Sequence, residues 1–205
     1  MRELNFRRYA VAKLVAKARE TSIAGKAQRG FTIVEVLVVM VMVGILAAIA
    51  GPGWLSFVNN QRLRQSGDRA LVAAREAQSE SRKRASVWVA SFREFDGQVQ
   101  WAVHPEGSTT PIWQEILNGE SDRVQIDTAN STLSSDCATG DYCVKFSDRG
   151  TLDEDWFNDQ SPADELVGRV TFASSDSASP NSKRCLVITT ILGTMQVTRG
   201  DNCTS

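Results

Sequence analysis

The feature that most constrains this chain is an uninterrupted apolar stretch at residues 36–55, VLVVMVMVGILAAIAGPGWL, which contains no charged side chain. As a helix rising 1.5 Å per residue, such a segment spans roughly 30 Å, the thickness of a bilayer's hydrocarbon core. A buried core helix is the alternative, but a domain of this size rarely encloses so long an apolar helix. The stretch predicts a membrane-spanning helix over about residues 33–57.

Charge is distributed unevenly around this stretch. Lys and Arg outnumber Asp and Glu by eight to two in residues 1–30 and by eight to three in residues 61–93, whereas residues 94–205 hold seven against eighteen. Short basic flanks stay in the cytoplasm, so the chain after the span is predicted to lie across the membrane. The acidic balance of the last block argues against a domain that grips nucleic acid through its phosphates.

Two residues at the beginning of the apolar stretch stand out. Gly30 lies at the predicted membrane face, and Glu35 is an isolated carboxylate at the edge of the apolar run. Burying a carboxylate in hydrocarbon costs several kcal/mol, so Glu35 is expected to have a partner. The alternative is a carboxylate at the level of the headgroups, reaching water. A secretory signal peptide does not fit, because its apolar region is only 7–15 residues long.

Residues 26–55 resemble the N-terminus of type IV prepilins and type II secretion pseudopilins. The likeness centres on Gly30, which follows basic residues, and on the FTIVE segment after it. It implies that prepilin peptidase, an inner-membrane enzyme, cuts between Gly30 and Phe31 and methylates the new N-terminal Phe31. It also implies that Glu35 pairs with the terminal amine of a neighbouring subunit, which supplies the expected partner.

The resemblance extends to Gly44 and Pro52, which stand where many family members carry a Gly and a Pro that bound a weakened part of the helix. Proline removes a backbone donor and clashes with the preceding turn, so a kink or local melting at Pro52 is expected independently of the family. The expected organisation is a basic leader, residues 1–30, that is cleaved off, followed by a pilin helix over residues 31–85.

Beyond Pro52 the helix is predicted to continue to about Arg84. Four apolar residues recur at helical spacing on one face: Leu63, Ala70, Ala74 and Ala77. Ser66 and Gly67 mark a soft point in this helix. The basic balance of the segment could attract anionic lipid headgroups or acidic neighbours, although a solvated helix face is the favoured interpretation.

From residue 86 the apolar pattern changes from helical to alternating. Two predicted strands flank a hairpin turn at residues 96–98, and five further strands follow; the seven ranges are 87–95, 99–103, 124–127, 142–146, 167–173, 186–191 and 195–198. The fold class is therefore α+β, with a long N-terminal transmembrane helix packed on an antiparallel β-sheet domain. Residues 144–150 and 186–197 also resemble the GspH/FimT family, which implies a periplasmic β-sandwich over residues 86–205.

All four cysteines follow the apolar stretch, on the side of the membrane where disulfides can form. Four cysteines allow three pairings. A terminal hairpin folded about residues 192–193 brings Cys185 near residues 201–203, which favours a Cys185–Cys203 bond and leaves Cys137 with Cys143. Zinc binding is the rival interpretation, but the spacing matches no common zinc motif and the chain has a single His.

The sequence offers no enzyme chemistry: it has no nucleophile elbow, no P-loop and no dinucleotide fingerprint. No enzyme activity, cofactor or metal is predicted. The acidic run at residues 153–165 could bind Ca²⁺, but it lacks the glycine and the alternation of an EF-hand loop. A solvated surface loop is the favoured interpretation.

The resemblance leaves two machines open. One is the type II secretion system, in which an H-like minor pseudopilin sits near the pseudopilus tip. Its partners there are major and minor pseudopilins, the inner-membrane assembly platform and, at the tip, secreted exoproteins. The other is a type IV pilus with a FimT- or FimU-like minor pilin, active in fibre initiation, motility or DNA uptake. The DNA-binding family members carry Gly-Arg-x-Arg in the terminal hairpin, whereas Gly193 is followed here by Thr-Met-Gln, so DNA is disfavoured as a partner. A third possibility is an anchored binding protein that never assembles, for which Glu35 would be dispensable.

Overall fold

The computed structural model describes residues 30–135, 137–159, 167–175 and 182–204. The chain divides into two compact units, Met1–Ala48 and Ile49–Ser205. Helix α2, Ile33–Arg84, supplies the described secondary structure of the first unit and continues into the second. Residues 1–29 of the predicted leader 1–30, and residues 160–166 of the acidic run, lie outside the described residues.

The second unit combines part of α2 with two antiparallel four-stranded sheets, so the fold is α+β as predicted. The first sheet has the order β3-β2-β1-β5 and the second β4-β6-β7-β8. In chain order the strands are β1 Trp88–Phe95, β2 Gln98–Pro105, β3 Gln114–Glu115, β4 Val124–Ile126, β5 Tyr142–Phe146, β6 Gly168–Ser174, β7 Lys183–Ile188 and β8 Met195–Arg199. Short 3-10 helices η1 Ser121–Arg123, η2 Thr128–Asn130 and η4 Gly200–Cys203 complete it, together with α3 Glu154–Asp159.

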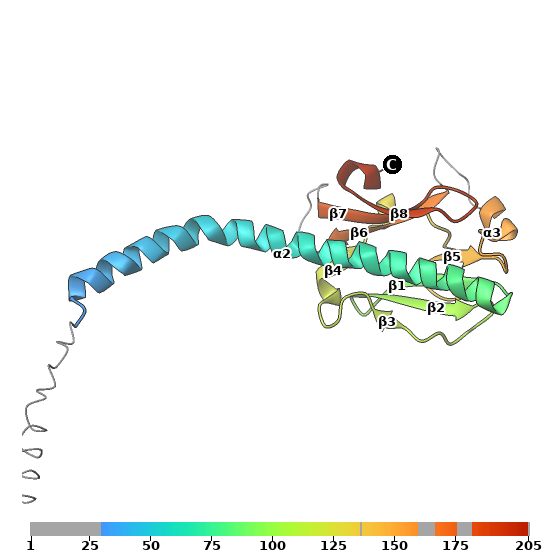
Figure 1. Ribbon diagram of the computed structural model, residues 1–205, viewed down its shortest axis with the longest axis horizontal. Helices are drawn as coiled ribbons and strands as arrows, with labels where there is room; N and C mark the ends of the chain where they lie inside the picture. Colours follow the sequence, from blue (N-terminus) through green and yellow to red (C-terminus); the bar gives the residue numbers. More distant parts are fainter. Residues whose placement is uncertain (1–29, 136, 160–166, 176–181, 205) are drawn as a thin grey trace, which may run out of the picture. The chain divides into compact units, whose positions relative to one another are not determined.

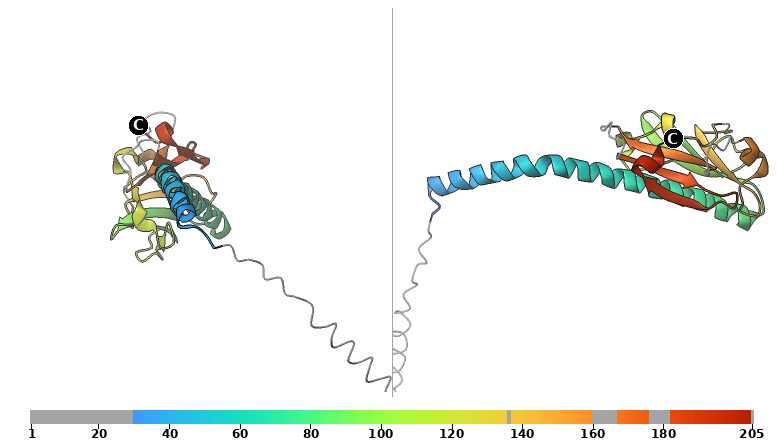
Figure 2. Two further views of the ribbon diagram at one scale, coloured as in Figure 1. Left: turned by 90° about the vertical axis from the view of Figure 1, so that its left-hand side faces the viewer. Right: turned by 90° about the horizontal axis from the view of Figure 1, so that it is seen from above.

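The two sheets share one apolar core with α2. The rings of Phe92 on β1 and Phe172 on β6 meet edge to face, with centroids 6.4 Å apart. Figures 1 and 2 show the part of α2 in this unit running alongside both sheets. Its buried face consists of Leu63, Ala70, Ala73, Ala74 and Ala77, in agreement with the helical spacing in the sequence. Small alanine side chains let the helix backbone approach the strands closely.

Gly67 is a packing point rather than the soft point that the sequence predicted. It is buried, and a Cβ at this position would lie 2.8 Å from Val197 Cγ1 on β8. The neighbouring Ser66 is fully buried, and its hydroxyl donates to the Arg62 carbonyl at 3.0 Å. Gly67 is therefore a point of close contact between α2 and the second sheet.

Helix α2 ends where the sequence predicted, and the first hairpin follows. Ala85 has a left-handed φ of 47°, and the Ser86 N–H donates to the Ser81 carbonyl, which closes the helix with a Schellman-type turn. Asp96 and Gly97 both have positive φ and form a two-residue turn between β1 and β2. The second strand therefore begins at Gln98, one residue earlier than expected.

Several strand limits differ from prediction. Strand β3 was not predicted, because two residues are too few to show alternation. Strand β7 lies at Lys183–Ile188 rather than 186–191, because residues 190–194 form a hydrogen-bonded loop in which the Gly193 N–H donates to the Thr190 carbonyl. As a result Cys185 faces Thr198, not residues 201–203 as the sequence analysis expected.

Part of the acidic run is helical, so the expected surface loop is wrong for this part. The Asp153 carboxylate accepts a hydrogen bond from the Trp156 N–H at 3.1 Å and caps α3. Trp156 is only 4% exposed and joins the main core, while Glu154 and Asp155 are exposed. In the described ranges no three His, Cys, Asp or Glu side chains gather as a metal site.

Candidate functional site

The candidate site lies at the start of α2, where a threonine organises the first turn. The Thr32 hydroxyl accepts a hydrogen bond from the Glu35 N–H at 3.2 Å, and the Thr32 carbonyl accepts one from the Val36 N–H. Thr followed three residues later by Glu is the pattern of a capping box. The sequence analysis missed this role of Thr32, although the pattern was there to be read.

The predicted cleavage point is open to another protein. Gly30 and Phe31 precede α2, and Phe31 is 80% exposed. A Cβ on Gly30 would meet no atom of the chain within 4 Å. The described chain therefore gives no internal packing reason for glycine here, and an enzyme that fits closely around the backbone would supply one.

Glu35 has an exposed carboxylate whose partner does not come from the described residues. Its backbone N–H is bound to Thr32, but across the described ranges no hydrogen bond or ion pair holds its side chain. A negative charge in the first turn of a helix is favoured by the helix dipole by roughly 0.3–1 kcal/mol. The structure therefore leaves the carboxylate free for a cation from outside the chain.

The first unit presents an apolar surface with no core of its own. Every side chain from Phe31 to Ala48 is exposed, including Ile33, Val34, Leu37, Met40, Met42 and Leu46, each at least 60%. A Cβ on Gly44 would also meet nothing within 4 Å. Contiguous apolar surface of this extent marks a site that lipid or another protein covers.

The sequence predicts a membrane span at residues 33–57, and the helix segments of the structure can be compared with it. In the part of the chain that the structure describes, no single helix is long and apolar enough to cross a membrane, but the pair Ile33–Ile49 and Gly53–Arg84 fits together by length and composition. The whole of Ile33–Arg84, Pro52 included, is assigned to α2. The predicted weakening between Gly44 and Pro52 stays a prediction.

The four cysteines form two disulfides in the second unit, Cys137–Cys143 and Cys185–Cys203. This is the pairing that the sequence favoured, although the strand register that brings Cys203 to Cys185 differs from the expected one. Since β8 ends opposite the start of β7, the short helix η4 turns the chain back and brings Cys203 to Cys185. The C-terminus is thereby tied to the second sheet.

The comparisons with known proteins single out the same region. Residues 25–51 match the family model of the prokaryotic N-terminal methylation motif. This match supports a type IV pilin-like protein. No curated protein and no protein of solved structure matches the chain.

The matched residues contain Gly30, Phe31, Glu35 and Gly44, which lie in the exposed part of the chain described above. Such a motif indicates processing by prepilin peptidase, membrane anchoring and assembly with other pilins. Proteins of this kind are generally structural rather than enzymatic. Residues 52–205 lie outside the match, so the motif itself does not distinguish one pilus-like machine from another.

Proposed function

We propose that the chain is a minor pseudopilin of the type II protein secretion system, an H-like component of the pseudopilus tip. Prepilin peptidase cuts it between Gly30 and Phe31 and methylates Phe31. One observation carries this proposal: the methylation motif coincides with the start of α2, where the cleavage point is exposed and the Glu35 side chain has no partner among the described residues.

The proposed location is the bacterial inner membrane, crossed once, with the N-terminus in the cytoplasm and the second unit in the periplasm. Eight Lys and Arg in residues 1–30 support this orientation, because short basic flanks remain cytoplasmic. Two disulfides in the second unit support it as well, because the periplasm permits oxidation.

The exposed apolar side chains and the Glu35 carboxylate of the first unit suit assembly with other subunits. In the membrane, lipid covers the apolar side chains of residues 31–49; in the fibre, the helices of neighbouring subunits take its place. The Glu35 carboxylate then pairs with the terminal ammonium of a neighbour's Phe31, which fixes the axial register of the two helices. The inner-membrane assembly platform drives the transfer, and exoproteins meet the tip.

The alternative is a FimT- or FimU-like minor pilin of a type IV pilus, which uses the same N-terminal signal. The DNA-uptake form of this role has little support in the second unit. Residues 94–205 carry eighteen acidic against seven basic side chains, and the loop between β7 and β8 contains no arginine. A role in starting a type IV pilus remains the second candidate.

A deletion strain tests the choice of machine. Exoprotein in the culture supernatant and pili on the cell surface are scored side by side, with a strain complemented by the intact gene as the control. Exoprotein trapped in the periplasm with normal pili is the expected result. Normal secretion with lost pili would overturn the secretion role and favour the pilus.

A strain carrying Glu35→Ala tests whether the protein assembles at all. A single-pass binding protein that never enters a fibre has no use for this carboxylate. We expect an unchanged membrane level of the protein with loss of function in the assay that the deletion identifies. Full function of the variant would favour the non-assembling binding protein.

A further inference from the structure

Three arginines lie together where α2 passes the second sheet. Arg64 is on α2, Arg184 is near the start of β7, and Arg199 ends β8 directly opposite Arg184 in the strand register. Arg184 is half-buried, whereas Arg64 and Arg199 are exposed. Burial, together with the nearby charges of Arg64 and Arg199, lowers the pKa of the Arg184 guanidinium. Like charges placed directly opposite each other on neighbouring strands destabilise a sheet.

The described residues leave this cluster without an ion pair. Asp68 is the one acidic group that counteracts the repulsion on Arg184, and within the described ranges no hydrogen bond or salt bridge holds the side chain of any of the three arginines. Nearby Arg62 differs, because its guanidinium donates to both Glu120 oxygens at 2.9 and 3.1 Å. The cluster therefore keeps an excess of positive charge.

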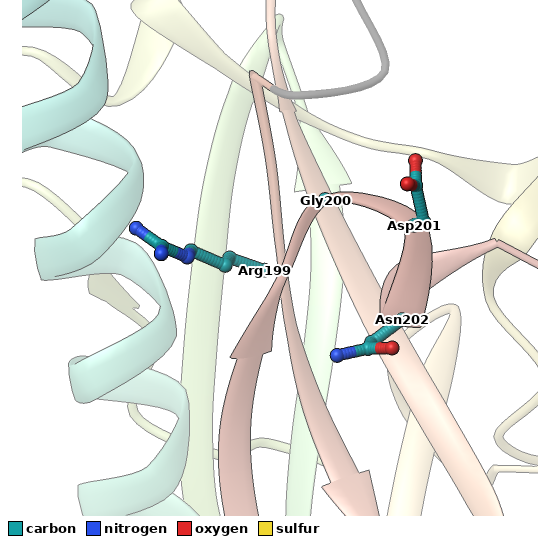
Figure 3. Close-up of a pocket in the computed structure, with 4 residues that line it drawn as sticks. All are labelled: Arg199, Gly200, Asp201 and Asn202. Carbon is teal, nitrogen blue, oxygen red and sulfur yellow. The ribbon is translucent and has the colours of Figure 1, made fainter.

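The side chains after β8 do not neutralise it either. Arg199, Gly200, Asp201 and Asn202 line a cavity of about 380 Å³. Figure 3 shows Arg199 extending toward α2, whereas the Asp201 carboxylate projects from the opposite side of the backbone. Asp201, the acid nearest to Arg199 in the sequence, thus points away from the Arg199 guanidinium.

The cluster lies close to the end of the apolar stretch within the same unit. Trp54 and Phe57 are 69% and 59% exposed, and their ring centroids are 5.9 Å apart. Exposed aromatic side chains of this kind gather at the boundary between bilayer and water. Arg64 follows Phe57 by seven residues, roughly 10 Å along a helix, which matches the depth of the headgroup layer beside the hydrocarbon core.

We propose that Arg64, Arg184 and Arg199 bind the phosphate of an anionic phospholipid headgroup on the face of the membrane from which the second unit emerges. Guanidinium groups pair with phosphate through two parallel hydrogen bonds, and such a pair relieves the repulsion between Arg184 and Arg199. The bound lipid holds the second unit at the membrane surface before assembly. This inference rests on the membrane anchoring in the proposed function, not on the choice of machine.

The test is a native mass spectrometry titration of the full chain in neutral detergent. Phosphatidylglycerol and phosphatidylcholine with identical acyl chains are titrated separately, and inorganic phosphate is added as a competitor. The wild type is compared with the double variants R184Q/R199Q and R184K/R199K. Arg75→Gln is the matched control, because Arg75 is an exposed arginine of α2 roughly 27 Å beyond Phe57.

Phosphatidylglycerol should bind the wild type more tightly than phosphatidylcholine, and the preference should weaken about fivefold for each arginine replaced by Gln. The lysine pair and Arg75→Gln should retain it. Equal binding of the two lipids, or an unchanged preference in R184Q/R199Q, would overturn the proposal. Displacement of the lipid by millimolar inorganic phosphate would assign the site to free phosphate instead.

A second measurement separates this proposal from the proposed function. Membrane fractionation of the same variants should leave R184Q/R199Q in the membrane with the wild type, because the apolar stretch is intact. A wild type absent from the membrane would refute the anchoring. A variant that loses partner subunits on purification but keeps its lipid preference would show that the cluster serves an acidic protein surface, which contradicts the lipid site.

Discussion

Replacing Glu35 with Gln or with Ala tests what the charge of this side chain does. Glutamine serves as well as glutamate at the fourth position of a capping box, so Glu35→Gln should leave the start of α2 intact. It removes the charge that the neighbouring subunit's terminal ammonium needs. Glu35→Ala removes the charge and most of the side chain, but it keeps the backbone N–H that bonds to Thr32. Both variants should therefore reach normal membrane levels and fail to assemble.

Loss of the Glu35 charge has a small effect within a single chain and a large effect between subunits. The Glu35 N–H bonds to Thr32 whichever side chain follows, and the carboxylate is exposed, so each single chain loses only about 0.3–1 kcal/mol of helix-dipole stabilisation. Between subunits, opposite unit charges about 4 Å apart attract by about 4 kcal/mol at an effective dielectric constant of about 20. That energy corresponds to roughly three orders of magnitude in subunit association.

The assay is cross-linking to the major subunit in intact cells, scored beside the membrane level of each variant. Thr32→Ala is the control, because it removes the cap and keeps the charge. We expect cross-links in the wild type and Thr32→Ala, and almost none in Glu35→Gln. Wild-type cross-linking of Glu35→Gln would refute the charge-pair reasoning, since assembly would then not need the charge.

Three further predictions concern processing, packing and acid stability. Gly30→Glu should block cleavage while Gly30→Ala is cut more slowly, as an electrophoretic shift would show; equal cleavage of both and the wild type would disprove the cleavage point. Gly67→Ala should lower the free energy of unfolding, measured in urea, by about 1–3 kcal/mol, because the new Cβ would overlap Val197 on β8. Gly53 has open space around it, so Gly53→Ala is the control and should leave the free energy of unfolding unchanged or raise it by up to about 1 kcal/mol. Burial raises the pKa of the Asp127 carboxyl, but hydrogen bonds, chiefly from Lys183 at 2.6 Å, lower it more. The stability that this pair adds, about 1 kcal/mol, should be present above about pH 4 and lost as pH falls further; Asp127→Asn should flatten that part of the unfolding profile, and an identical profile would contradict the assignment.

The helix and most strands could be read from the sequence because their apolar periods are regular. Leu63, Ala70, Ala74 and Ala77 lie one or two turns apart, and burial follows that spacing. The strands on either side of residues 96–98 and the strand at residues 142–146 are rich in valine and aromatic residues, and Asp-Gly between the first two marks a tight turn. The pairing of the cysteines followed from the terminal hairpin, even though its register was wrong.

The rest depends on contacts that a local pattern does not contain. Strand β3 is too short to show a period, and the acidic residues around Trp156 obscured a capped helix with one buried face. The arginine cluster joins Arg64 of α2 to Arg184 and Arg199 on β7 and β8, which follow more than a hundred positions later in the chain. A partner outside the chain is not visible in the sequence either. The proposed partner of Glu35 is indicated only by a carboxylate that the apolar stretch itself does not explain.

The N-terminal peptide of the protein, extracted from the membranes of its own host, tests the central claim most directly. Mass spectrometry of that peptide reads both the cleavage point and the modification. The account predicts a chain that begins at Phe31 and carries one additional methyl group. A chain that retains residues 1–30, or that begins at another residue without a methyl group, would contradict it.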